Sequence, residues 1–80
     1  MLVLNYSITG TKHVFKDDVT GDCVMASYAV RRGMPEVLLM PCSGTGQLSS
    51  FVELYGECGS ELTPADAFKV VERYNNGARY

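Results

Sequence analysis

Hydrophobic positions in the first half of the chain recur at the spacing of β-strands. Residues 2–8 carry Leu, Leu, Tyr and Ile at every second position, and residues 12–16 contain a second apolar stretch. Residues 23–31 and 36–41 flank the turn sequence Arg-Gly-Met-Pro at 32–35 and are rich in apolar, strand-compatible residues. The first half of the chain therefore predicts about four short antiparallel strands.

Residues 23–32 also fit a helix that Gly33 would cap, since apolar side chains recur there at helical spacing: Val24, Met25, Tyr28 and Ala29. We favour strands, because strand-compatible residues lie on both sides of the turn sequence. In addition, no strong helix-capping box precedes Cys23.

The apolar period changes in the second half of the chain. Residues 47–55 place four apolar side chains on one helical stripe, and Gly56 follows. Residues 64–75 begin with Thr63-Pro64, a hydroxyl at the N-cap followed by proline, and carry the stripe Ala67, Phe68, Val71 and Tyr74. We therefore expect an α+β fold in which helices 47–55 and 64–75 cover one face of a small antiparallel sheet.

The strands expected at 23–31 and 36–41 are apolar on both faces. An antiparallel sheet with one face in water normally alternates apolar and polar residues. Two helices can cover only one face, so we expect the second face to meet another protein or a second copy of the chain.

Composition narrows the class of protein. The 80 residues predict a single domain, 1–80, with 46% hydrophobic and 20% charged residues, which is typical of a soluble globular protein. A net charge of −2, with no basic run longer than Arg31-Arg32, disfavours direct nucleic-acid binding. The apolar runs are too short to cross a membrane, and the first residues do not resemble a signal peptide, so we expect a cytoplasmic protein without a membrane partner.

Candidate catalytic and metal-binding residues are few. Three cysteines without C-x-x-C spacing, and His13 as the one histidine, predict reduced thiols with no disulfide framework, metal site or cofactor. The loop after Cys42, Ser-Gly-Thr-Gly, could cradle a phosphate, but it lacks the Walker lysine and has Leu48 where a cysteine phosphatase carries arginine. We therefore expect no enzyme, and a thiol or phosphate enzyme built on Cys42 is the alternative.

Side chains suited to a protein interface lie on the predicted strands. Tyr is large, stiff and amphipathic, and Met adapts to irregular surfaces. Tyr28 fits either a core or an interface role, while Met25 and Ala29 project from the opposite face of the same strand. Tyr6 also fits either role, although alternation groups it with the apolar residues of strand 2–8 on the face expected to turn inward.

The chain resembles the small phage type I-F anti-CRISPR proteins, which share its length and its order of a strand meander followed by two helices. The similar positions are Met1-x-Val3-Leu4-x-Tyr6, His13-Val14-Phe15, Thr45-x-Gln47-Leu48-x-Ser50-Phe51 and Tyr55-Gly56.

The resemblance implies a non-enzymatic inhibitor that docks its sheet on a CRISPR surveillance complex and blocks the access of DNA. Family tyrosines on the sheet and one acidic residue make that contact. Tyr6 matches one tyrosine, Phe15 keeps a ring without the hydroxyl, and strand 23–31 lacks the acid.

We therefore expect a small inhibitor that covers the surface of a partner protein or complex. Its expected contact residues are Tyr6, Phe15, Met25, Tyr28 and Ala29. A homodimer closed through the sheet face is the second hypothesis.

Overall fold

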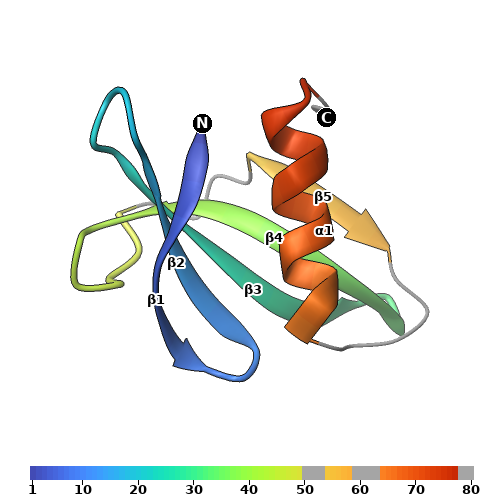
Figure 1. The fold of residues 1–80 in the computed structure, drawn as a ribbon. Helices are drawn as coiled ribbons and strands as arrows, with labels where there is room; N and C mark the ends of the chain where they lie inside the picture. Colours follow the sequence, from blue (N-terminus) through green and yellow to red (C-terminus); the bar gives the residue numbers. More distant parts are fainter. Residues whose placement is uncertain (50–53, 59–63, 78–80) are drawn as a thin grey trace.

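The computed structural model of the 80-residue chain describes residues 1–49, 54–58 and 64–77. Five strands form one antiparallel sheet in the order of the sequence: β1 (Leu2–Thr9), β2 (Lys12–Asp17), β3 (Cys23–Arg31), β4 (Met34–Cys42) and β5 (Tyr55–Cys58). One helix, α1 (Pro64–Asn75), lies across one face of this sheet (Figure 1). The α+β class and the antiparallel sheet are thereby confirmed.

The four strands predicted from the first half of the chain are present, and the helical alternative for residues 23–32 is wrong. β3 and β4 pair along their whole length, from Cys23 opposite Cys42 to Arg31 opposite Met34. The turn between them contains Arg32 and Gly33, with φ angles of 53° and 75°. Positive φ at both central residues is the geometry of a tight two-residue hairpin turn. Because the turn is so short, β4 begins at Met34, two residues before the predicted start at residue 36.

The expected pair of helices is wrong, because the helix predicted at 47–55 is absent from the described part of that range. Leu48 forms an isolated bridge with Cys42, and Tyr55 begins β5; residues 50–53 lie outside the described residues. β5 pairs with Glu36–Leu39 of β4, and the Leu54 N–H donates to the Leu39 carbonyl at 2.7 Å. This segment therefore pairs with the backbone N–H and C=O groups on the outer edge of β4. A helix at 47–55 would leave those groups without partners.

Helix α1 confirms the prediction for 64–75. Its Ala67, Val70 and Val71 side chains are buried, and the Ala67 N–H donates to the Tyr28 hydroxyl at 3.3 Å. This bond joins the first turn of α1 to β3. Among the described residues, no helix has the length and apolar character needed to cross a membrane.

The main core lies between α1 and the sheet face that it covers. The buried apolar side chains of this face and of the helix form one contiguous cluster: Leu2, Phe15, Val24, Ala26, Val37, Leu39, Ala67, Val70 and Val71. Leu39 is fully buried at the centre of the sheet. The core therefore joins all parts of the chain, from β1 to α1.

Two β-bulges in β1 change which side chains face the core. Leu4 pairs with Phe15, but the next paired residue is Tyr6, opposite Val14. Paired residues share a sheet face, so the extra residue Asn5 turns Tyr6 to the face opposite α1. The expectation that Tyr6 faces inward with Leu2 and Leu4 is wrong for this reason.

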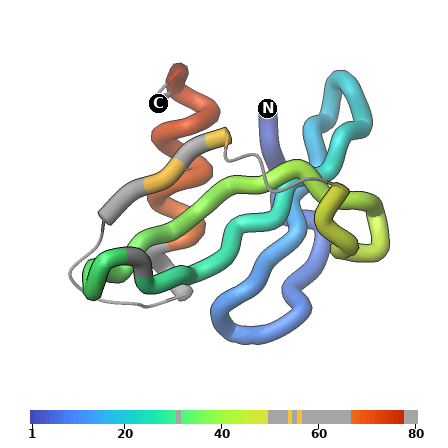
Figure 2. Tube along the Cα trace, turned by 180° about the vertical axis from the view of Figure 1, so that it is seen from behind, coloured from blue at the N-terminus to red at the C-terminus, as the bar shows by residue number. Residues whose placement is uncertain are grey.

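The second sheet face is partly covered by the chain itself. The loop at 43–49, yellow-green in Figure 2, contributes Leu48 to the rim of a second buried cluster made of Val14, Met25 and Cys42. Tyr6, Cys23 and Leu48 border that cluster. The sequence analysis expected this face to be open, and the loop closes one end of it.

Asp17 is expected to resist protonation in the folded protein. Its Oδ1 accepts hydrogen bonds from the Thr20 and Val19 amides at 3.0 and 2.8 Å, and these bonds lower the pKa of the carboxyl below its ordinary 3.8. A lowered folded pKa adds stability above the unfolded value, and that stability is lost as the pH falls through the folded value. An NMR titration should place the midpoint of Asp17 below 3.8, and a midpoint at or above 3.8 would contradict this prediction.

Candidate binding surfaces

The five contact residues expected from the sequence divide between the two faces of the sheet. Phe15 and Tyr28 lie on the face that α1 covers, whereas Tyr6, Met25 and Ala29 lie on the other. The structure therefore does not gather them into one surface.

Two of these residues belong to the core under α1. Phe15 is 2% exposed, and its ring meets the edge of the Phe68 ring at a centroid distance of 5.7 Å. Tyr28 is half-buried, packs against the main core and accepts the bond from the Ala67 amide. Their rings stabilise the docking of the helix, and the expectation that they touch a partner directly does not fit this position.

On the second face, the loop at 43–49 decides what a partner can reach. Met25 is 5% exposed in the cluster under this loop, so it is not available for direct contact. Tyr6 is half-buried and donates its hydroxyl to the Gly44 carbonyl at 2.9 Å. Ala29 is half-buried and lies outside the second cluster.

Gly46 lets the loop approach β1 closely. Its φ is +84°, and a Cβ at this position would lie 2.8 Å from Cδ1 of Ile8 and 3.2 Å from the Tyr6 hydroxyl. Only glycine adopts this backbone conformation without strain, and a side chain would also displace Ile8. The Ser-Gly-Thr-Gly sequence therefore serves to close the loop over the sheet.

Cys42, the nucleophile of the alternative thiol enzyme, and His13, the one histidine that could serve as its base, lie on opposite faces of the sheet. Cys42 belongs to the cluster under the loop, whereas His13 pairs with Ala26 on the helix face. The His13 ring accepts or donates a bond at 2.7 Å between Nδ1 and the Ser7 hydroxyl, and it lies 5.3 Å from the Phe68 ring. A Cys–His catalytic pair is therefore not formed.

The described residues do not form a reactive thiol site, a metal site or a phosphate site. Burial raises the pKa of the Cys42 thiol, with a smaller contribution from Cys23, so the reactive thiolate is disfavoured. Among the described residues, no three His, Cys, Asp or Glu side chains gather closely enough to hold a metal ion. The loop at 43–49 leads into an isolated bridge at Leu48, so it lacks the helix start that the phosphate hypothesis required.

Cys42 is expected to be alkylated more slowly than Cys23 in the folded protein. Cys42 is 8% exposed with a raised pKa, whereas Cys23 is half-exposed. Timed labelling with iodoacetamide at pH 8, followed by peptide mass spectrometry, should show at least a tenfold slower reaction at Cys42. In denaturant we expect Cys42 and Cys23 to be alkylated at equal rates. Equal alkylation rates in the native protein would contradict the burial of the Cys42 thiol.

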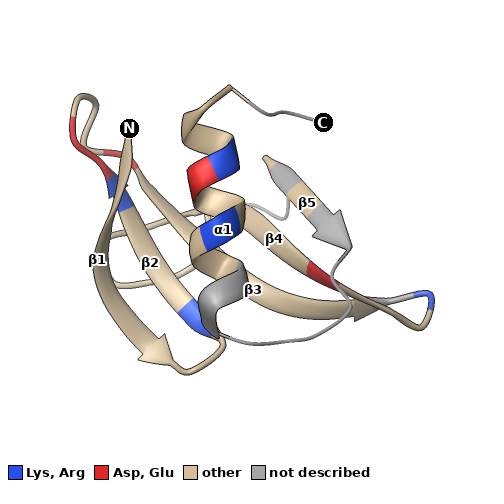
Figure 3. Ribbon diagram, turned by 45° about the vertical axis from the view of Figure 1, so that its right-hand side comes forward, with Lys and Arg blue, Asp and Glu red and all other residues tan. Residues whose placement is uncertain are grey.

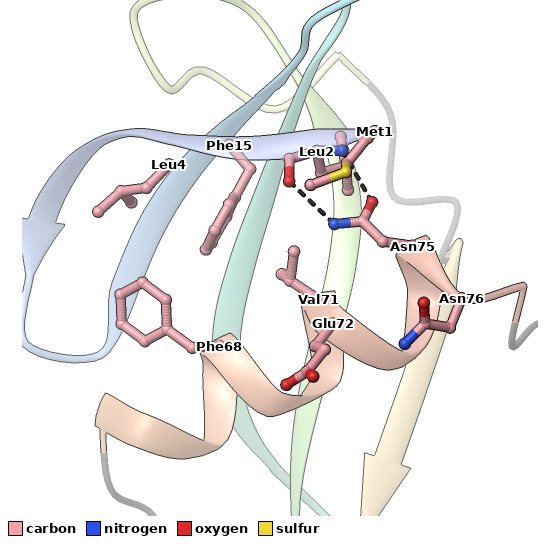
Figure 4. Close-up of a pocket in the computed structure, with 9 residues that line it drawn as sticks. All are labelled: Met1, Leu2, Leu4, Phe15, Phe68, Val71, Glu72, Asn75 and Asn76. Carbon is pink, nitrogen blue, oxygen red and sulfur yellow. Dashed lines mark hydrogen bonds between the residues drawn. The ribbon is translucent and has the colours of Figure 1, made fainter.

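The described residues also form a groove between β1 and α1, with a volume of about 380 Å³. Figure 4 shows Phe15 and Val71 between its two walls, which are formed by Leu4 on β1 and Phe68 on α1. Met1 and Leu2 line the end nearest the C-terminus of α1. The lining is thus mainly apolar, as is usual for sites that bind an organic group.

Polar residues close one end of this groove. The Asn75 side chain accepts a bond from the Leu2 amide at 2.8 Å and donates one to the Leu2 carbonyl at 2.9 Å. These two bonds, drawn in Figure 4, join the end of α1 to the start of β1. Glu72 and Asn76 line the groove beside them.

The walls of the groove remain accessible to a partner. Leu4 is 46% exposed, Phe68 is 42% exposed and Met1 is 65% exposed. Figure 3 shows acidic and basic residues on the exposed side of α1, whereas β1 carries none. The surface at the groove is therefore an apolar patch with charge along its helical side.

Sequence patterns did not reveal this groove. Phe68 was placed on the buried helical stripe, but Val70 is buried instead and Phe68 lies at the edge of the contact with the sheet. The one hint in the sequence is that two large aromatic residues, Phe68 and Tyr74, lie at the borders of the apolar stripe of helix 64–75, where a ring can be partly exposed. The position of the neighbouring β1 wall depends on strand order and could not be read from periodicity.

Comparisons of this chain with protein-family models, with curated proteins and with solved structures found no match. Its function is therefore inferred from the side chains and backbone groups described above.

Proposed function

We propose that this chain is a small non-enzymatic binding protein that acts by covering a surface of another protein. The observation that supports this proposal is the groove between β1 and α1, with exposed apolar side chains at Met1, Leu4 and Phe68. Apolar side chains that gather at the surface of a small domain are typical of interaction sites. A partner that inserts a side chain between Leu4 and Phe68 would remove this surface from water.

The most specific form of the proposal is an inhibitor of a host defence complex, which is what the resemblance to type I-F anti-CRISPR proteins implies. Such an inhibitor would act in the cytoplasm of the host cell. Tyr6 bears on this form only through the loop at 43–49, because the bulge at Asn5 turns its half-buried ring to the face opposite α1, where its hydroxyl donates to the Gly44 carbonyl. Tyr6 and the groove wall Leu4 share β1 but lie on opposite faces of the sheet, so the groove and Tyr6 are separate surfaces.

A direct test measures binding of target DNA by a purified type I-F surveillance complex in the presence of this protein. We expect the wild-type chain to reduce DNA binding, the Phe68→Asp variant to lose this effect, and the Ala29→Asp variant to retain it. Circular dichroism of both variants would verify that they fold. Full DNA binding at a saturating concentration of the wild-type protein would refute the anti-CRISPR form.

A homodimer is the second candidate function. Ala29 and Met34 lie on the sheet face opposite α1, beyond the cluster under the loop, and Met34 is 52% exposed. Two copies could close over this part of the face by an isologous contact. Light scattering at micromolar concentration decides between the candidates, since a dimer that Ala29→Asp dissociates would favour the second.

A further inference from the structure

We infer that the outer edge of β1 binds an extended segment of a partner protein, which adds a strand to the sheet and places a large apolar side chain between Leu4 and Phe68. This inference rests on the proposed binding function and specifies the chemistry of the partner. The binding mode combines backbone hydrogen bonds for affinity with side-chain contacts for specificity.

The first observation is the use that the chain itself makes of the β1 edge. β1 is the outermost strand on its side of the sheet. Both outward backbone groups of Leu2 bond to the side-chain amide of Asn75, at 2.8 and 2.9 Å. The Asn75 amide thus takes the place of one peptide group of a neighbouring strand, which shows that peptide-like groups fit this edge.

The second observation is the next outward position, Leu4. Backbone groups of an edge strand point alternately toward and away from its neighbour, so the N–H and C=O of Leu4 point outward like those of Leu2. The register agrees, since Leu4 lies opposite Phe15 two positions after Leu2, and no turn, loop or side-chain hydrogen bond among the described residues reaches the Leu4 backbone. Unpaired backbone groups at a sheet edge are the template on which another strand adds.

The third observation is that β1 lacks the usual obstacles to strand addition. Over Leu2–Thr9 it has no charged residue and no proline, the residues with which proteins often block an edge. Two bulges, at Leu4–Tyr6 and Ser7–Thr9, interrupt its register with β2. They limit a new strand to a short pairing centred on Leu4, with Ser7 as the next outward position.

The groove explains why the added strand should carry a large apolar side chain. The groove lies directly beside the Leu4 edge, and its volume of about 380 Å³ is sufficient for a large side chain. Phe15 and Val71, which are 2% and 4% exposed, form its base. A side chain that enters there would bury the exposed parts of Leu4 and Phe68 together.

Charge defines a second feature of the partner segment. Glu72 is the one charged side chain that lines the groove, and among the described residues it has no ion-pair partner, whereas the N-terminal ammonium of Met1, which also lines the groove, pairs with Asp17 and Asp18. Glu72 follows Phe68 by one helical turn, and residues four apart on a helix lie about 5–6 Å from each other. Alternate side chains of a strand are about 7 Å apart. We therefore expect Lys or Arg two positions from the apolar residue.

The test uses a phage-displayed library of linear dodecapeptides selected against the full chain. We expect the enriched peptides to carry a large apolar residue and a Lys or Arg two positions away. One enriched sequence, made as a blocked synthetic peptide, should protect the Leu4 amide from hydrogen exchange. Failure to enrich any sequence over a selection against Phe68→Asp would overturn the inference.

Two modified proteins separate strand addition from simple apolar binding. Chemical synthesis can place N-methyl-leucine at position 4, which removes the outward donor and keeps both the side chain and the bonds to β2. We expect the affinity for the synthetic peptide to fall at least tenfold with this protein and at least as much with Glu72→Lys. The matched control is Val19→Asp in the turn between β2 and β3, where Val19 is 85% exposed, and it should bind normally.

The outcomes are distinct from those of the proposed function. Binding that N-methylation leaves unchanged would overturn strand addition, even if the chain inhibits a surveillance complex. Dimerisation that N-methylation prevents would assign the edge to a second copy and would also overturn the inference. A protein that binds such peptides through Leu4 but fails to inhibit the complex would refute the anti-CRISPR form and leave strand addition supported.

Discussion

Leu39→Ala is expected to destabilise the fold by about 3 kcal/mol, within the range for removing a large buried side chain. Leu39 is fully buried in β4, opposite Ala26 and within the cluster that joins the sheet to α1. A domain of this size has a total stability of roughly 4–12 kcal/mol. This single substitution should therefore remove a large part of the free energy of unfolding.

The measurement for this variant is urea denaturation followed by circular dichroism. Leu4→Ala is the matched control, because it deletes the same atoms at a position that is 46% exposed. We expect the control to lose less than half as much stability. Equal losses in the two variants would show that Leu39 does not occupy the centre of the core.

Asn75→Asp is expected to weaken the attachment of α1 to β1 by about 1–2 kcal/mol, because it breaks a partly buried hydrogen bond and leaves one carbonyl unsatisfied. The aspartate keeps an acceptor for the Leu2 amide but has no donor for the Leu2 carbonyl, which the Asn75 amide bonds at 2.9 Å. Its negative charge also lies at the C-terminal end of the helix, where the helix dipole disfavours it.

Asn76→Asp provides the control for charge. It introduces the same carboxylate one residue later, on an exposed side chain that makes no bond to β1 within the described part of the chain. The difference in unfolding free energy between the two variants therefore reports the lost bond to Leu2. Hydrogen exchange at the start of β1 should increase in Asn75→Asp alone, and equal behaviour of the variants would contradict this assignment.

The strands of the first half could be predicted because their signals are local. Alternation and the Arg32-Gly33 turn act within a few residues, and the observed β3–β4 hairpin follows from them. Helix α1 was predicted for the same reason, since proline at the start and a buried stripe lie within one segment. The partial exposure of the Phe68 ring could not be predicted, because the apolar stripe of a helix does not show how far the sheet extends beneath that helix.

The segment at 47–58 shows where local patterns fail. Apolar residues at helical spacing predicted a helix, but Tyr55–Cys58 pairs with β4. The edge of β4 needs backbone partners, and that requirement comes from a strand more than ten residues earlier in the sequence. Helical spacing over ten residues could not outweigh it.

The sequence alone determined the α+β class, the antiparallel strands of the first half and the final helix, but it also predicted a second helix at 47–55 that the described residues do not form. The tertiary structure decided where accessible apolar surface lies. The Leu2–Asn75 bonds set one end of the groove, whereas the bulge at Asn5 and the loop closed by Gly46 decide what is covered on the opposite face. These features depend on contacts between distant residues, up to 73 positions apart, whereas periodicity records only what neighbouring residues share.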